Sequence, residues 1–166
     1  TSLFENEKTT FEGRYYQLKD APLSPKPLQR PRPPLLVGGR GEKVTLRIVA
    51  QYADEWNVGG TPEVYAHKSS VLAKHCADVG RDPSEIKRSV GAFYLVTDEP
   101  AEIDNIDRSG FGTMDLFAGT ADEIKTVVKR YEELGVDELV VTSVNVGDPV
   151  AEQEHYDRFI QQVAPA

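Results

Sequence analysis

Apolar and polar positions in residues 35–166 alternate between short strand-like runs and longer stretches with helical spacing. The first apolar run, 35–37, follows two prolines and leads through a glycine cluster into a helical pattern over 42–53. The apolar positions of this pattern are Val44, Ile48, Val49 and Tyr52. The order predicts a strand, a glycine turn and a helix.

Three further strand and helix pairs follow the first. Strands are predicted over 55–58, 89–96 and 138–142, and helices over 62–79, from Thr120 to a stop at Gly135, and from Asp148 onward. Thr61 before Pro62, and the capping box of Thr120 with Glu123, are typical helix starts. Four strand–helix units in series predict an α/β fold with four parallel strands.

Two segments depart from this alternation. Residues 98–118 form a predicted connection with a short helix near 99–107, and a connection of this length is typical of a lid or an ordered excursion. Residues 1–20 place aromatic side chains around Gly13 and predict a hairpin, and six of the 11 prolines lie in 21–34, where they predict an extended connector. We therefore divide the chain into a hairpin excursion with a proline-rich connector, 1–34, and four strand–helix units, 35–166.

Charge and composition narrow the class of partner. A net charge of −8 argues against nucleic acid and anionic membranes, and no apolar run reaches the roughly 18 residues of a membrane helix. We therefore expect a small-molecule substrate. The single Cys76 excludes an internal disulfide and no signal-peptide pattern opens the chain, so we expect a cytoplasmic protein.

The glycine turns are the candidate binding site. They follow the first two predicted strands, and the residues concerned are Gly38, Gly39, Arg40, Gly41, Gly59, Gly60 and Thr61. Glycines let the backbone approach a ligand closely, and the first amides of the next helix point outward at the positive end of its dipole. The pattern predicts a phosphate site, although paired glycines also end strands for steric reasons alone.

Other chemistry is sparse. The three histidines, His67, His75 and His155, read as solvated or capping residues, and no metal-ligand spacing or nucleophile elbow occurs. Trp56 lies on an inward strand and is interpreted as core packing, with stacking near a ring system as the alternative. We assign no catalytic residue and no metal ligand.

Four motifs in order carry a resemblance to a known family. They are Thr-Phe-x-Gly-x-Tyr-Tyr at 10–16, Pro-Pro-apolar-Gly-Gly at 33–39, Ala-Asp-x-Trp at 53–56 and Gly-Arg-Asp-Pro at 80–83. In this order they resemble the bacterial luciferase-like monooxygenases, in particular the branch of oxidoreductases that use a flavin or the deazaflavin coenzyme F420. The resemblance runs from Thr9 to about Val144.

The resemblance implies a fold and a cofactor. It aligns the chain with the C-terminal half of a (β/α)8 TIM barrel, strands five to eight, and it implies that the glycine turns hold the phosphate of FMN or coenzyme F420. Many relatives carry a small residue where this chain has Arg40, so the guanidinium either binds phosphate or lies across the site. The family's proton-transfer groups come mainly from the first half of the barrel, so this chain alone would be catalytically incomplete.

Half a barrel exposes strand edges and an apolar flank, which must associate with something. We expect a missing N-terminal half, pairing between copies, or a remnant of a longer protein, since the chain begins at Thr1. Two rival interpretations stay open. One is a non-catalytic half-barrel that serves as an assembly or binding module, and the other is a self-contained flavodoxin-like domain.

Overall fold

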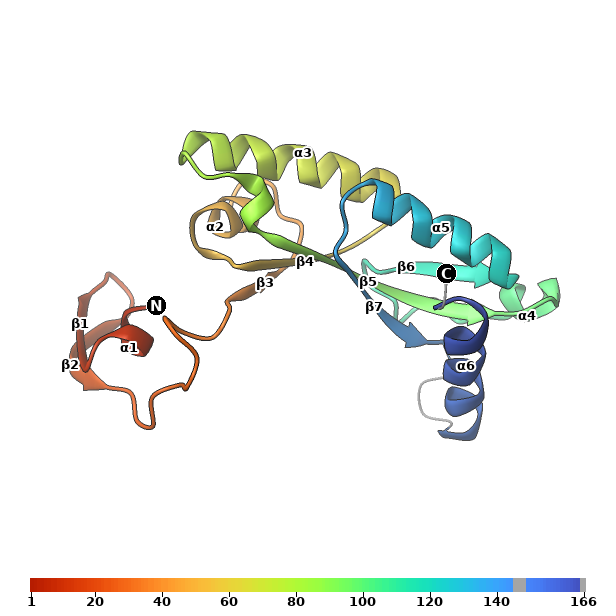
Figure 1. Cartoon of the computed structure of the whole chain (residues 1–166), viewed down its shortest axis with the longest axis horizontal. Helices are drawn as coiled ribbons and strands as arrows, with labels where there is room; N and C mark the ends of the chain where they lie inside the picture. The colour runs from red at the N-terminus through yellow and green to blue at the C-terminus, as the bar shows by residue number, and fades with distance from the viewer. Residues whose placement is uncertain (145–148, 165–166) are drawn as a thin grey trace. The chain divides into compact units, whose positions relative to one another are not determined.

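The computed structural model describes residues 1–144 and 149–164, and the chain divides into two compact units, Thr1–Leu35 and Leu36–Ala166 (Figure 1). The first unit contains helix α1 (Ser2–Glu5) and the antiparallel strands β1 (Lys8–Glu12) and β2 (Gln17–Pro22). The side chains of Tyr15 and Tyr16, at the turn between these strands, are exposed. They do not contribute to a core.

The second unit alternates strands and helices. Its strands are β3 (Leu36–Gly38), β4 (Glu55–Gly59), β5 (Lys87–Val96), β6 (Asp115–Gly119) and β7 (Glu138–Ser143). Its helices are α2 (Thr45–Tyr52), α3 (Pro62–Asp78), the short η1 (Pro83–Glu85), α4 (Pro100–Asp104), α5 (Ala121–Glu133) and α6 (Pro149–Gln162). Asp148, which we expected to begin the last helix, lies outside the described residues.

The sheet is parallel throughout and is organised around β5. Strand β3 pairs with β4, and β4 pairs with the first half of β5, from Glu55 opposite Lys87 to Gly59 opposite Gly91. The second half of β5 pairs with β6, and β7 pairs with β5 over 89–94. The residues of β5 that pair with β7 include some that pair with β4 and some that pair with β6. Strands β4 and β6 therefore follow one another along one edge of β5, and β7 lies along the other edge.

The four predicted strands are present, and β6 is an addition to them. We had expected residues 98–118 to be a connection with a short helix, and the structure has that helix as α4 but ends the segment in a strand. Phe117 of β6 is buried in the core, and Val96 pairs with Gly119. A five-residue strand directly before a capping box has too little periodicity to be read from sequence.

The helices cover one face of the sheet. The buried side chains of β4 and β5 on this face, among them Trp56, Val90 and Tyr94, form one apolar cluster with residues of α2, α3, α5 and α6. We call it the helix face, and the opposite one the inner face. Figure 1 shows α3 and α5 following one another along the same side of the sheet. A doubly wound flavodoxin-like domain would need helices on both faces, so that rival is not supported.

Helix α2 has two apolar stripes and buries one of them. Its buried residues are Leu46, Val49 and Ala50, whereas Val44 and Tyr52 are 66% and 59% exposed. Ile48 is also exposed. Both stripes of this helix are apolar, so the sequence pattern did not select between them, and only the position of the sheet does.

Candidate functional site

The two glycine turns lie side by side at the carboxyl ends of β3 and β4. The strands pair in register with Gly38 opposite Asn57, and the amide of Gly39 donates to the carbonyl oxygen of Asn57 at 2.9 Å. A β-carbon added to Gly60 would lie 3.7 Å from Nη1 of Arg40. The structure therefore brings Gly38–Gly41 and Gly59–Thr61 together on one rim of the sheet.

Several of these glycines cannot be replaced without strain. Gly39 and Gly60 have φ angles of +125° and +127°, a region that side chains rarely adopt. A β-carbon on Gly60 would lie 2.8 Å from Cγ1 of Val64, and one on Gly41 would lie 2.8 Å from Oγ1 of Thr45. Gly38 has open space around it. The turns are shaped by close packing against the helices that follow them.

Two buried aromatic residues bind the carbonyl groups of these turns. Nε1 of Trp56 donates to the carbonyl oxygen of Gly39 at 2.8 Å, and the hydroxyl of Tyr131 donates to that of Gly60 at 2.7 Å. Trp56 is fully buried and stacks on Tyr65 with ring centroids 5.9 Å apart, as expected of a core residue. Sequence reasoning found neither hydrogen bond, because the partners are 17 and 71 residues apart.

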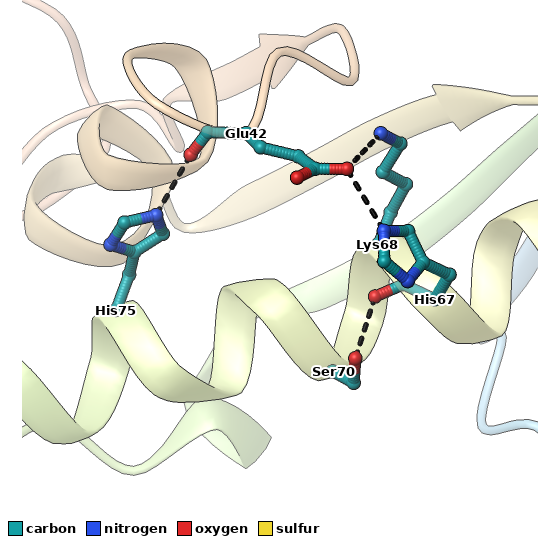
Figure 2. A network of polar contacts seen from close by, with 5 residues as sticks. All are labelled: Glu42, His67, Lys68, Ser70 and His75. Atoms are coloured by element: carbon teal, nitrogen blue, oxygen red, sulfur yellow. Dashed lines mark hydrogen bonds and ion pairs between the residues drawn. The ribbon is translucent and has the colours of Figure 1, made fainter.

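Side chains of α3 hold the loop between the first turn and α2. The Glu42 carboxylate accepts from Lys68 and lies 2.9 Å from Nε2 of His67, and Nε2 of His75 donates to the Glu42 carbonyl oxygen at 2.8 Å (Figure 2). The hydrogen bonds from Lys68 and His67 lower the pKa of the Glu42 carboxyl. These two histidines anchor the loop, a role that their sequence positions did not reveal.

A cavity of about 480 Å³ opens beside the turns. It is lined by Arg40, Glu42, Glu63, Val64, His67 and Lys68. Both carboxylates have cationic partners, since Glu42 contacts Lys68 and Glu63 contacts Arg130. Among residues 1–144 and 149–164 the exposed Arg40 guanidinium makes no hydrogen bond or ion pair, so the cavity carries one unneutralised cation.

Thr61 caps the start of α3, as the sequence predicted. Its hydroxyl caps α3 by accepting from the amide of Val64 at 3.4 Å. The pKa of the Glu63 carboxyl is lowered, first by the backbone hydrogen bond of Glu63 and then by the hydrogen bond from the Thr61 hydroxyl. The hydroxyl is thus engaged within the first turn of α3, and the backbone amide of Thr61 is the group that remains for a ligand.

Comparison with known proteins identifies the family. The family model of the luciferase-like monooxygenases matches residues 1–107. The chain belongs to this family.

Other members of the luciferase-like family are longer than this chain. An FMNH2-dependent dimethylsulfone monooxygenase of Pseudomonas putida is 27% identical over an alignment 134 residues long, which covers 72% of this chain and 35% of that enzyme. An F420-dependent secondary alcohol dehydrogenase has a TM-score of 0.75 at 18% identity, covering 98% of this chain and 57% of its own. The F420-dependent tetrahydromethanopterin reductase of Methanopyrus kandleri has the same TM-score at 16% identity, covering 99% and 59%.

These structural likenesses show the fold. The neighbours are luciferase-like proteins built as TIM barrels, and each match covers nearly all of this chain but little more than half of theirs. The α/β fold with parallel strands and helices is therefore confirmed as part of that architecture. A TIM barrel carries its helices on the outer face of the sheet, which agrees with the helices of this chain covering one face only.

A second cavity, of about 510 Å³, lies at the same rim of this luciferase-like fold. It occurs where β5 and β7 end, and it is lined by Leu95, Glu102, Asn105, Ile106, Asp107, Val144 and His155. Nδ1 of His155 lies 3.2 Å from the hydroxyl oxygen of the fully buried Ser143. We had read His155 as a solvated or capping residue, and only the packing of α6 against β7 brings it to a cavity.

The part of the chain that the structure describes holds neither a candidate metal-binding cluster nor a helix that could span a membrane. No cluster of three His, Cys, Asp or Glu side chains there could hold a metal ion. No helix in residues 1–144 or 149–164 has the length and apolar character needed to cross a bilayer.

Proposed function

We propose that this chain is the C-terminal part of a luciferase-like oxidoreductase or monooxygenase, and that its two glycine turns hold the phosphate of FMN or coenzyme F420. The observation that carries the proposal is the adjacency of the turns, with Arg40 beside Gly60 on one rim. Relatives named for FMNH2 and for F420 support the choice of cofactor class.

The residues present fit such a group. Backbone amides of Arg40 and Thr61 can donate to phosphate oxygens, because the neighbouring glycines leave no β-carbon between ligand and backbone, whereas the Gly39 amide is already bonded to Asn57. Arg40 supplies a charge that can turn toward the phosphate, whereas the exposed Lys43 does not line the cavity. When bound, the isoalloxazine or deazaflavin ring supplies hydride or oxygen chemistry.

The chain's own contribution is to bind and orient. Lys68 and His67 hold the Glu42 carboxylate, and His75 holds its carbonyl oxygen, so the loop that bears Arg40 is fixed to α3. A small organic substrate would lie along the same rim, toward the cavity at the ends of β5 and β7. We assign no catalytic residue to this chain, so we propose that it is incomplete as a catalyst by itself.

The open flanks of the unit support a partner. Strand β3 pairs with β4 only, within the described residues, and the apolar side chains of Leu36 and Val140 on the inner face are about half exposed. On the outer side, Val44, Ile48 and Tyr52 form an exposed apolar stripe of α2. An N-terminal half-barrel or a second copy of this chain would cover these surfaces.

The proposal is tested by measuring affinities for ligands with and without phosphate. Fluorescence titration of the purified protein should give an affinity for FMN at least tenfold above that for riboflavin, and likewise for coenzyme F420 over its dephosphorylated form. Equal affinities for each pair would contradict a phosphate site.

A non-catalytic assembly module is the second candidate, and the exposed stripe of α2 favours it. This alternative predicts that neither FMN nor coenzyme F420 binds, and that sedimentation shows self-association of the chain or its binding to a separate half-barrel. Binding of FMN with the expected preference would remove it.

A further inference from the structure

The carbonyl groups of Gly39 and Gly60, the two turn glycines with positive φ angles, point into the core, where each accepts a hydrogen bond from one aromatic side chain. Trp56 of β4 binds the carbonyl oxygen of Gly39, and Tyr131 of α5 binds that of Gly60. Both donors are fully buried and belong to one aromatic cluster, in which Tyr65 stacks on Trp56 and meets Tyr131 edge-on with centroids 6.3 Å apart. The two turns are therefore held by the same part of the core.

The direction of these carbonyl groups sets the direction of the amides that follow. The Gly39–Arg40 and Gly60–Thr61 bonds are trans, and in a trans peptide the C=O and N–H groups point to opposite sides of one plane. A carbonyl oxygen held inward thus turns the next amide outward. Neither the Arg40 nor the Thr61 amide donates to any group that the structure describes.

We propose that Trp56 and Tyr131 are positioning residues for the phosphate site: by fixing the carbonyl groups of Gly39 and Gly60 they aim the amides of Arg40 and Thr61 at one anion. This inference rests on the proposed function and adds the residues that preorganise the site. Without the two donors each peptide plane could rotate, because glycine permits both orientations. An amide that must rotate before it binds contributes less to affinity.

Tyr131 is suited to this role at every physiological pH. Burial raises the pKa of its hydroxyl, and the nearby carboxylate of Asp115 raises it further, so the group keeps the proton that it donates. The hydroxyl lies 2.7 Å from the Gly60 oxygen and 3.2 Å from Oδ2 of Asp115. Its single proton is best shared with the nearer oxygen.

A third member of the cluster provides a matched control. The hydroxyl of Tyr65 donates to the carbonyl oxygen of Gly135 at 3.3 Å. Gly135 precedes β7, at the amino ends of the strands, so this hydrogen bond cannot orient an amide of the proposed site. Tyr65→Phe removes one buried hydrogen bond from the same cluster without touching the two turns.

The test compares FMN and riboflavin in each variant of the whole chain. Trp56→Phe and Tyr131→Phe should each reduce the ratio of FMN affinity to riboflavin affinity about tenfold, whereas Tyr65→Phe should leave that ratio unchanged. Both ligands bind the same folded fraction, so a loss of stability cancels in the ratio. A ratio that stays at the wild-type value in Trp56→Phe and Tyr131→Phe, while the wild type prefers FMN, overturns the positioning role alone. A wild type without any preference for FMN overturns the proposed function and this inference with it.

Discussion

The backbone of Thr113 crosses the end of β4 so closely that a β-carbon on Gly59 would lie 2.8 Å from the Thr113 carbonyl oxygen. The same segment stacks Phe111 on Phe93 of β5, with ring centroids 4.1 Å apart. It also places Sδ of Met114 at 3.3 Å from the β-carbon position of Gly91. Residues 111–114 therefore cover the inner face of the sheet where β4 ends, and glycines make room for them.

Gly59→Ala should displace this segment. The clash is with backbone, which cannot rotate away as a side chain can, so we expect the free energy of unfolding to fall by about 1–3 kcal/mol. Urea unfolding measures the change. Gly38→Ala is the matched control, because the space around Gly38 is open and its φ angle is not positive. Equal stability of the two variants would show that residues 111–114 do not lie against Gly59.

The contacts of Glu42 should make stability depend on pH. Its carboxyl pKa is lowered in the folded state, by Lys68 first and then His67, so the ionised group stabilises the fold above its unfolded pKa. This contribution is lost as the pH falls through the lowered value. Glu42→Gln should therefore reduce the urea midpoint at pH 7 and have a smaller effect near pH 3.

Two lysines of α3 give the comparison for this pH effect. Lys68→Met removes the first partner of Glu42 and should reproduce the pH-dependent loss of Glu42→Gln, whereas the exposed Lys74→Met should change the midpoint little at either pH. A Glu42→Gln effect that is equal at pH 7 and pH 3 would rule out a role for the ionised carboxylate.

Tyr94→Phe should stabilise the protein. The Tyr94 hydroxyl is buried and finds no hydrogen-bond partner among the described residues, and burial raises its pKa. Removing an unsatisfied hydroxyl recovers its desolvation cost, so the free energy of unfolding should rise by about 1 kcal/mol. In contrast, Tyr65→Phe removes a hydroxyl that is bonded to Gly135 and should lower it by about 1 kcal/mol. Thermal unfolding of both variants gives the two signs, and a loss in Tyr94→Phe would reveal a partner for that hydroxyl.

Arg40→Ala tests which of its two roles the guanidinium has. Because the side chain is exposed, lines the cavity and is unpaired, we expect it to bind the phosphate, and its removal should weaken FMN about tenfold and leave riboflavin unchanged. Fluorescence titration provides both affinities, with the exposed Arg47→Ala on α2 as control. Tighter binding of FMN by Arg40→Ala would instead place the guanidinium across the site.

Features that depend on neighbours within a few residues could be read without a structure. The capping box is one: the hydroxyl of Thr120 accepts from the amide of Glu123, whose carboxylate accepts from the amide of Thr120 at 2.8 Å. The start of α3 at Thr61 and Pro62 is another. The four motifs likewise identified the family, because their order along the chain is itself sequence information.

The sequence by itself determined the alternation of strands and helices, the caps, the glycines at two strand ends and the family. Only the tertiary structure decided which stripe of α2 is buried, that β6 joins β5, that Trp56 and Tyr131 bind the turn carbonyls and that His155 lines a cavity. Local order follows from hydrogen bonds between residues close in the chain, which a linear pattern records. The other features join residues 12 to 71 positions apart, and several equally apolar arrangements fit that pattern until the sheet selects one.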